Sequence, residues 1–140
     1  MLQVVVDNNV LISALVGHGK PRRLLTELLE RHQVVSSPQM LAEFVEVMSR
    51  EKFAEVGRSR LASFLSIIVC RTPIVSVKHT RRVVAQDPED DMVLSTALKG
   101  NASYIVSGDE HLLDLKRFKG VKIVTVDEML ETLGPRTAAS

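Results

Sequence analysis

Four acidic residues of this chain are spaced so that an alternating α/β fold could gather their carboxylates at one end of its sheet. They are Asp7, Glu43, Asp91 and Asp109. The first of them ends the apolar, largely β-branched run of residues 2–6, which predicts a strand buried on both faces. Asp7 is therefore expected at the C-terminal end of that strand.

The same arrangement recurs late in the chain, where the strand-like residues 102–106 lead into Ser107, Gly108 and Asp109. In open parallel sheets, ligands bind beyond the carboxyl ends of the strands, near the point where the strand order reverses. If the two strands are neighbours at that point, Asp7 and Asp109 face one pocket.

Glu43 lies on an expected helix over residues 39–49, at the edge of the apolar stripe formed by Met40, Phe44 and Val47. A carboxylate at such an edge loses part of its hydration and needs a cation or hydrogen-bond donors in return. Its position alone leaves two interpretations open, namely a metal-ligating glutamate or an ordinary residue at the boundary between core and solvent.

Asp91 lies on another expected helix, which Asp87 begins and which Gly100 stops. It shares one helical face with Leu94 and Leu98, so its carboxylate is expected to point toward the sheet. Asp87 and its neighbour Asp90 fall on the first turn, where negative charge stabilises a helix N-terminus. A capping role is therefore the expectation for both.

A cluster of carboxylates favours Mg²⁺ or Mn²⁺, because these hard ions prefer carboxylate and water ligands. Such an ion makes a bound water a better nucleophile toward a phosphodiester and offsets charge on the phosphate oxygens. The sequence motifs of other active sites are absent, since the chain has no Walker-type phosphate loop, no dinucleotide fingerprint, no zinc pattern and no serine nucleophile elbow. Of the four histidines only His111 is near the expected site, and a surface position is the simpler interpretation for it.

The composition fits one domain with an aliphatic core. The chain has 140 residues, of which 45% are apolar, with one Tyr and no Trp, and its net charge of +1 neither demands nor excludes a nucleic-acid partner. Its single cysteine, Cys70, is expected to be a small core residue of a protein in the reducing cytoplasm. No run approaches the roughly 18 apolar residues of a membrane span, and the N-terminus lacks a basic leader.

Expected helices and strands alternate along the chain. Strands are expected over residues 2–6, 33–36, 71–77, 102–106 and 121–126, and helices over residues 10–16, 21–31, 39–49, 58–69, 87–99 and 127–133. Strands separated by helices need crossover connections, which predicts a three-layer α/β/α domain around a mostly parallel sheet of four to five strands. Residues 134–140 are expected to form a frayed tail.

The acidic residues and the segments around them resemble a PIN domain, similar to the ribonuclease toxins of VapC-type toxin–antitoxin pairs. The resemblance rests on residues 4–10, on Glu43, on residues 91–94 with Ala97 and Leu98, and on the segment from Tyr104 to Asp109. It covers nearly the whole chain, and it implies a single PIN-like nuclease domain over residues 1–133. Each of these four sequence segments alone is a weak signal for the family, and together they are moderately specific for it.

By this resemblance the four acidic residues would hold Mg²⁺ or Mn²⁺, with Asn9 and Ser107 as polar support or substrate contacts. The resemblance also implies cleavage of single-stranded RNA, homodimerisation and inhibition by a small antitoxin protein. The family often has Ser or Thr after the first Asp, where this chain has Asn8. That departure leaves the metal set intact and changes the contacts around it.

Two further patterns bear on partners. Three basic clusters flank the expected site and could contact phosphates, although a solvated charged face is the better account of any single cluster. They are Lys20, Arg22 and Arg23; Lys78, His79, Arg81 and Arg82; and Lys116, Arg117 and Lys119. The helices over residues 21–31 and 58–69 carry apolar side chains on more than one side, which favours a homodimer over burial against the sheet alone.

Two other classes of function remain open from the sequence. A DNA nuclease or a phosphatase could use the same metal site on the same scaffold, although a phosphatase with an aspartate nucleophile is disfavoured because Asn9 stands two residues after Asp7. A catalytically silent binding module is the alternative of a different kind, and the complete set of acidic residues argues against it.

Overall fold

The computed structural model describes residues 1–77 and 88–134, and in this part of the chain five strands form one sheet. The strands are β1 (Gln3–Val6), β2 (Gln33–Val35), β3 (Tyr104–Val106), β4 (Arg117–Phe118) and β5 (Val121–Val124). They lie in the order β2-β1-β3-β5-β4, with β4 antiparallel to β5 and every other neighbouring pair parallel. The prediction of a mostly parallel sheet of four to five strands is confirmed.

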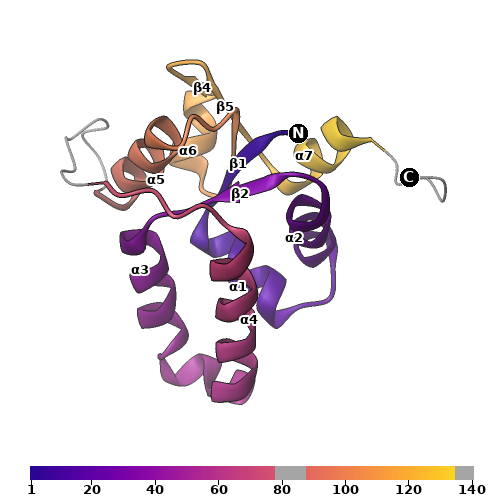
Figure 1. Cartoon of the computed structure of the whole chain (residues 1–140), viewed down its shortest axis with the longest axis vertical. Coiled ribbons are helices and arrows are strands. Elements are labelled where there is room, and N and C mark those ends of the chain that lie inside the picture. The colour runs from indigo at the N-terminus through magenta and orange to yellow at the C-terminus, as the bar shows by residue number, and fades with distance from the viewer. Residues whose placement is uncertain (78–87, 135–140) are drawn as a thin grey trace.

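Helices cover both faces of this sheet (Figure 1). They are α1 (Asn8–Val16), α2 (Lys20–Arg31), α3 (Pro38–Met48), the short 3-10 helix η1 (Glu51–Val56), α4 (Gly57–Arg71), α5 (Pro88–Lys99), α6 (Glu110–Leu115) and α7 (Val126–Leu133). Each expected helix is present within two residues of its expected start and end among the described residues, and η1 and α6 are additions.

The two faces of β1 belong to two separate hydrophobic cores, because successive side chains of a strand point to opposite sides. Val4 and Val6 pack with buried residues of α1, α2, α3, α4 and α7, whereas Val5 packs with residues of α5 and α6. All three valines are at most 2% exposed. The double burial explains why β1 reads as a continuous apolar run rather than an alternating one.

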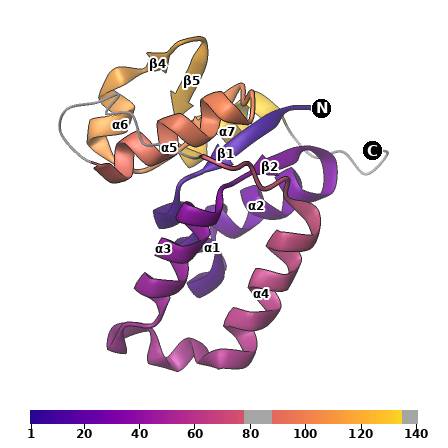
Figure 2. The same cartoon turned by 60° about the vertical axis from the view of Figure 1, so that its left-hand side comes forward.

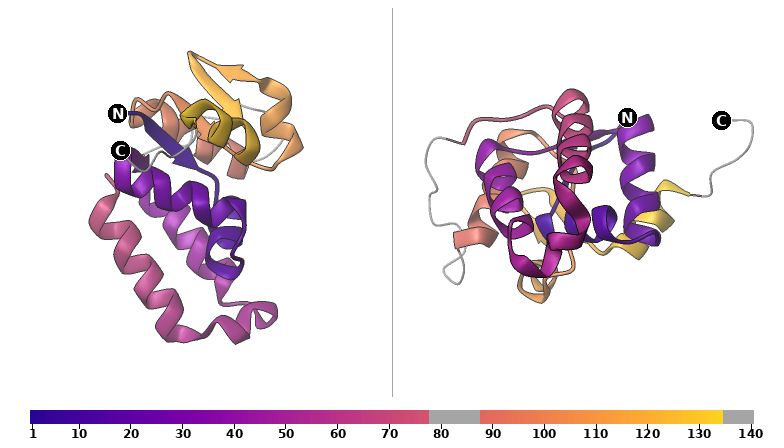
Figure 3. Two further views of the ribbon diagram at one scale, coloured as in Figure 1. Left: turned by 90° about the vertical axis from the view of Figure 1, so that its right-hand side faces the viewer. Right: turned by 90° about the horizontal axis from the view of Figure 1, so that it is seen from below.

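Helices α3 and α4, joined by η1, extend away from the sheet as a helical hairpin (Figures 2 and 3). Near its base the hairpin is held by the first core, where Phe44 of α3 is fully buried and stacks on Phe64 of α4 with 5.6 Å between ring centroids. Closer to the sheet along α4, Ile67 and Val69 are 50% and 52% exposed.

The prediction that Cys70 is a core residue is wrong, because its side chain is exposed. Among the residues of α4, only Ile68 is buried, while Leu61, Phe64 and Leu65 are half-buried. A helix of the extending hairpin contacts the core along one line only, so an apolar run does not bury every member.

The expected strand over residues 71–77 is also absent, since α4 continues to Arg71 and only one bridge forms beyond it. Ser36 pairs with Ile74 in parallel there, and Val75 N–H donates to the Ser36 carbonyl at 2.9 Å. Pro73 has no N–H, which limits the ladder at that point. The fifth strand of the sheet is instead β4, a two-residue edge strand that the sequence pattern did not reveal.

None of the helices in residues 1–77 and 88–134 is long and apolar enough to cross a membrane. The predicted tail lies outside the described residues from position 135 onward, as do Asp87 and the basic residues 78–82.

Candidate functional site

The strand order reverses between β1 and β3, which are adjacent and parallel. From β1 the chain crosses to β2 on one side, and from β2 it returns to β3 on the other side. A switch point of this kind opens a crevice beyond the carboxyl ends of the two strands. Asp7 follows β1 there and donates its backbone N–H to the Val106 carbonyl of β3 at 2.9 Å.

Ser107 joins the ends of the two strands through its hydroxyl group. Ser107 Oγ donates to Asp7 Oδ2 at 2.6 Å and accepts the backbone N–H of Asp109 at 3.0 Å, and the residue is 1% exposed. Although Asp7 is the N-cap of α1, its side chain makes no capping bond to that helix. The Asp7 carboxylate is therefore directed to the neighbouring strand, beside the loop that carries Asp109.

Asn8 connects the start of α1 to α3, the helix that carries Glu43. Its amide Nδ2 donates to the Met40 carbonyl at 2.8 Å across 32 residues of sequence, and the side chain is 7% exposed. Its other amide atom, Oδ1, is buried and has no hydrogen-bond partner within the described parts of the chain. Glu43 follows Met40 by three positions, less than one turn along α3.

Helix α5 is held against α3 by a buried hydroxyl pair. Thr96 Oγ1 donates to Ser37 Oγ at 2.9 Å, and both residues are fully buried. Ser37 is also the N-cap of α3, because its hydroxyl accepts the Met40 N–H at 3.3 Å. Two helices that carry acidic residues are thus linked at one point.

These contacts enclose a small cavity of about 40 Å³. It is lined by Asp7, Asn8, Asn9, Met40, Glu43, Asp90, Val93 and Asp109. Three of the four acidic residues that the sequence singled out therefore border one space, together with Asn9. The cavity has room for one small ion and very few waters, given that one water needs roughly 10–15 Å³ on the same kind of measure.

On α5 the structure differs from the sequence expectation, because Asp90 lines this cavity and Asp91 does not. Both are buried, at 4% and 2% exposure. Asp90 precedes the fully buried Leu94 by four positions and the buried Ala97 by seven, which puts it in the middle of the packed face. Adjacent helical residues differ by about 100° in direction, so the rotation of α5 about its axis determines which of the two aspartates faces the cavity.

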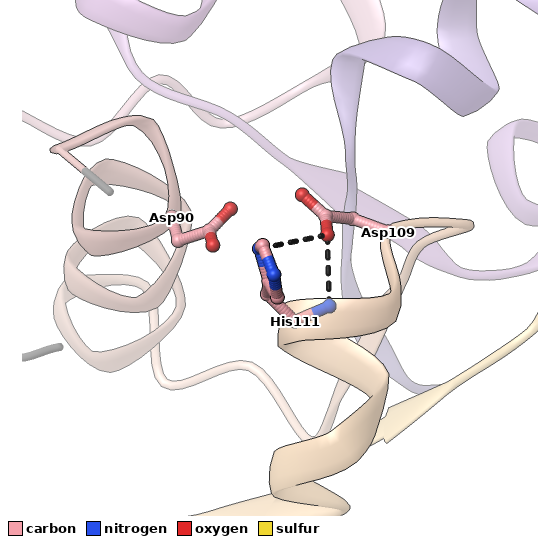
Figure 4. Close-up of side chains that lie close together, drawn as sticks. All are labelled: Asp90, Asp109 and His111. Carbon is pink, nitrogen blue, oxygen red and sulfur yellow. Dashed lines mark hydrogen bonds and ion pairs between the residues drawn. The ribbon is translucent and has the colours of Figure 1, made fainter. Parts of the chain in front are cut away.

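His111 is exposed, as the surface interpretation predicted, and it lies beside the acidic residues. One ligand atom each of Asp90, Asp109 and His111 lies within 4.8 Å of the other two. Figure 4 shows Asp90 of α5 facing Asp109 and the His111 ring at the start of α6. Asp109 Oδ1 accepts the His111 backbone N–H at 2.9 Å and is 3.9 Å from its Nδ1.

The basic clusters differ in what they contact. Arg22 donates to the Ala14 and Leu15 carbonyls at 2.9 and 2.8 Å, so its guanidinium group caps the C-terminal end of α1. Lys20 forms an exposed ion pair with Asp127 at 2.9 Å. Lys116, Arg117 and Lys119, which follow α6, are exposed.

Comparison with known proteins gives a family match and a distant relative. The family model described as PIN domain matches residues 3–111 of the chain. The uncharacterized protein MJ1680 of Methanocaldococcus jannaschii is 29% identical over 123 residues, which cover 82% of this chain and 76% of that protein.

Two solved structures share the fold at low sequence identity. The crystal structure of VapBC2 from Rickettsia felis, bound to a DNA fragment from its promoter, matches with a TM-score of 0.62 and 17% identity over 89% of this chain and 98% of that one. The crystal structure of PAE2754 from Pyrobaculum aerophilum matches with a TM-score of 0.61 and 14% identity over 97% of this chain and 91% of that one. Similarity at this level establishes a shared fold.

Proposed function

This chain belongs to the PIN-domain family, and on that premise we propose that it is a divalent-metal-dependent endoribonuclease that cleaves single-stranded RNA. The observation that carries the proposal is the cavity at the switch point, where four carboxylates from four separate segments border about 40 Å³ of space. Like charges repel at this range, so a fold that gathers them is best explained by a cation.

The donor set fits Mg²⁺ or Mn²⁺. Carboxylate oxygens of Asp7, Glu43, Asp90 and Asp109 are the hard ligands that these ions prefer. Asn8 also lines the cavity, and its neutral Oδ1 is a further buried oxygen. A buried carbonyl oxygen without a hydrogen bond costs roughly 1–3 kcal/mol, which contact with a cation or its water would offset. The sequence pattern pointed to Asp91. In the proposed ligand set Asp90 replaces it, because Asp90 lines the cavity.

Each polar residue of the site has a separate task in this proposal. When bound, the ion would lower the pKa of a coordinated water and offset negative charge on the phosphate. Ser107 holds the Asp7 carboxylate in one orientation through its 2.6 Å hydrogen bond, and Asn8 fixes α3 so that Glu43 stays at the cavity. Asn9 is exposed at the rim, where it can reach the RNA strand.

We also propose partners for the protein. The similarly folded Rickettsia felis structure is of a VapBC pair, which supports a small antitoxin as the partner of this chain and a role as the toxin of such a pair. A cytoplasmic location would suit RNA as the substrate. The single nuclease domain would span residues 1–133, followed by the short tail 134–140.

The exposed side of α4 supports a homodimer, because the apolar side chains of Ile67 and Val69 are half exposed there. Helix α2 is a weaker candidate, since its Leu24, Leu25 and Leu28 are buried in the first core. Light scattering at micromolar concentration tests the assembly. A mass near 15.5 kDa would contradict the dimer, and Ile67→Lys should convert a true dimer to that mass.

The decisive test of the proposed activity compares three substrates with and without Mg²⁺ or Mn²⁺. Single-stranded RNA, duplex DNA and a phosphomonoester are each incubated with the wild type and with Asp7→Asn. Metal-dependent cleavage of the RNA alone supports the proposal, whereas preferred cleavage of DNA or of the monoester supports the alternative enzymes on this scaffold. Metal-independent association with no cleavage of any substrate would support a binding module instead.

Metal binding is expected to raise the melting temperature, because the ion binds the folded state and not the unfolded chain. Mass action predicts that the folded state gains about 2.7 kcal/mol of stability when the free ion concentration is about a hundred times the dissociation constant. Differential scanning fluorimetry with Mn²⁺ measures the shift, and Asp7→Asn should blunt it. Equal shifts in the two proteins would place the ion elsewhere.

Replacing Asn8 by alanine is expected to cost about 1–3 kcal/mol of stability, because the buried bond to the Met40 carbonyl is lost. The same change should weaken Mn²⁺ binding in calorimetry, because α3 and Glu43 lose their tie to α1. Asn9→Ala is the matched control at the next, exposed position, with an expected stability change within about 0.5 kcal/mol. Unchanged stability and metal affinity in Asn8→Ala would remove Asn8 from the site.

A further inference from the structure

A second, larger groove begins where the carboxylate cavity ends. It has a volume of about 450 Å³, within the range of roughly 300–1,000 Å³ in which small-molecule sites fall. Asn9 lines both spaces, and Ser107, which bonds to Asp7, lines the groove. The groove and the carboxylate cavity therefore adjoin at Asn9.

The walls come from α1, the start of α2, the loop after β3, α6 and the start of α7. Val10, Pro21, Leu113 and Val126 supply apolar surface, and polar groups stand between them. Mostly apolar walls with a few polar groups are typical of sites that hold a flat organic ring and fix its orientation.

The charge of the groove argues against a phosphate as its occupant. Its charged lining residues are Lys20 and Asp127, which pair with each other at 2.9 Å. The ammonium group is thus already matched by a carboxylate, so the described residues of the lining offer an anion no excess positive charge. An uncharged part of a ligand is the better partner for this lining.

Gly108 leaves open space on the side of the groove next to Asp109. A Cβ atom built at this position would meet no atom within 4 Å, and the residue does not have the left-handed backbone that would require glycine. Neither the packing nor the backbone of the fold explains the missing side chain. The open space beside the carboxylates is available to a ligand.

We propose that this groove is a nucleoside subsite, which binds the base and ribose next to the phosphate that the carboxylate centre cleaves. The inference rests on the proposed nuclease function. A nucleoside is uncharged, its base has apolar faces and polar edges, and the phosphate attached to it would extend past Asn9 toward Asp7 and Asp109. The groove thereby anchors the RNA strand, while cleavage takes place at the adjoining cavity.

The direct test needs no catalysis. An uncharged nucleoside, adenosine or cytidine, is titrated into the ¹⁵N-labelled protein in EDTA, and inorganic phosphate is titrated in parallel. We expect the nucleoside, and not phosphate, to shift the amide signals of Asn9, Ser13, Gly108 and Val126. Shifts at these amides with phosphate alone, or with neither probe, would overturn the assignment.

A steady-state comparison of two variants at Ser13 tests the same groove in the enzyme. Ser13 is exposed on α1 and lines the groove, so Ser13→Gln fills space without disturbing the core, and Ser13→Ala is the matched control. With a short RNA, Ser13→Gln should raise KM about tenfold, the loss typical of one blocked contact, with kcat nearly unchanged. Circular dichroism and the melting temperature confirm that both variants fold.

The two hypotheses fail in different ways. If the wild type binds the nucleoside at these amides but cleaves no phosphodiester, the subsite stands and the nuclease proposal falls. If the wild type cleaves RNA with metal but shows no nucleoside shifts, and Ser13→Gln has the KM of Ser13→Ala, the subsite is wrong and the nuclease proposal stands.

Discussion

Replacing Asp90 by asparagine is expected to lower metal-dependent RNA cleavage at least about a hundredfold, because a ligand that helps to hold the ion supports several kcal/mol of transition-state stabilisation. Asparagine has nearly the same shape, so the packed face of α5 around Leu94 should be preserved. Gel-based cleavage of a labelled single-stranded RNA measures the loss. Circular dichroism should show that the variant is folded.

Asp91→Asn is the matched control, since it makes the same chemical change at the next residue of the same helix. Asp91 is buried but does not line the cavity, so its replacement should affect stability more than activity. The melting-temperature shift caused by Mn²⁺ should persist in Asp91→Asn and shrink in Asp90→Asn. The reverse pattern would show that the rotation of α5 is different in solution and that the sequence-based choice of Asp91 was correct.

Truncating Phe44 to alanine is expected to destabilise the protein by about 3–5 kcal/mol, the cost usual for removing a buried aromatic ring. Phe44 is fully buried in the first core and stacks on Phe64, so it joins α3 to α4 as well as to the sheet. Urea unfolding monitored by circular dichroism measures the change. Because Glu43 precedes Phe44, Mn²⁺ affinity should weaken too.

Phe44→Leu separates these two effects, because it keeps an apolar side chain in the core and should cost less, about 1–2 kcal/mol. If Phe44→Ala lost less stability than Phe44→Leu, the aromatic ring would not be what holds the helical hairpin to the core. If Phe44→Ala lost stability and kept full Mn²⁺ affinity at a temperature where it is folded, the position of Glu43 would not depend on this core contact.

Local chemistry in the sequence was enough to predict the sheet and its carboxyl edge. The continuous valine run before Asp7 predicts a strand that is buried on both faces, and the apolar segment before Ser107 predicts a second such strand. Helices between such strands require parallel crossovers, which place Asp7 and Asp109 at the same edge. The adjacency of β1 and β3 that this expectation needed is confirmed.

Other features depend on how elements pack against one another, and the tertiary structure alone decided them. Whether Asp90 or Asp91 borders the cavity depends on the rotation of α5, which Leu94, Ala97 and the Thr96 hydroxyl set through contacts with distant residues. The exposure of Cys70 follows from the direction in which the helical hairpin leaves the sheet.

Asn8 illustrates the same limit at the site itself. Its amide bonds to Met40, 32 residues away, and no periodicity in the sequence could reveal that contact. The groove beside Gly108 likewise exists only because α1, α2, α6 and α7 meet there. Residue types and spacing determine which groups can serve a site, because they set local structure and charge, whereas relative orientation comes from long-range packing.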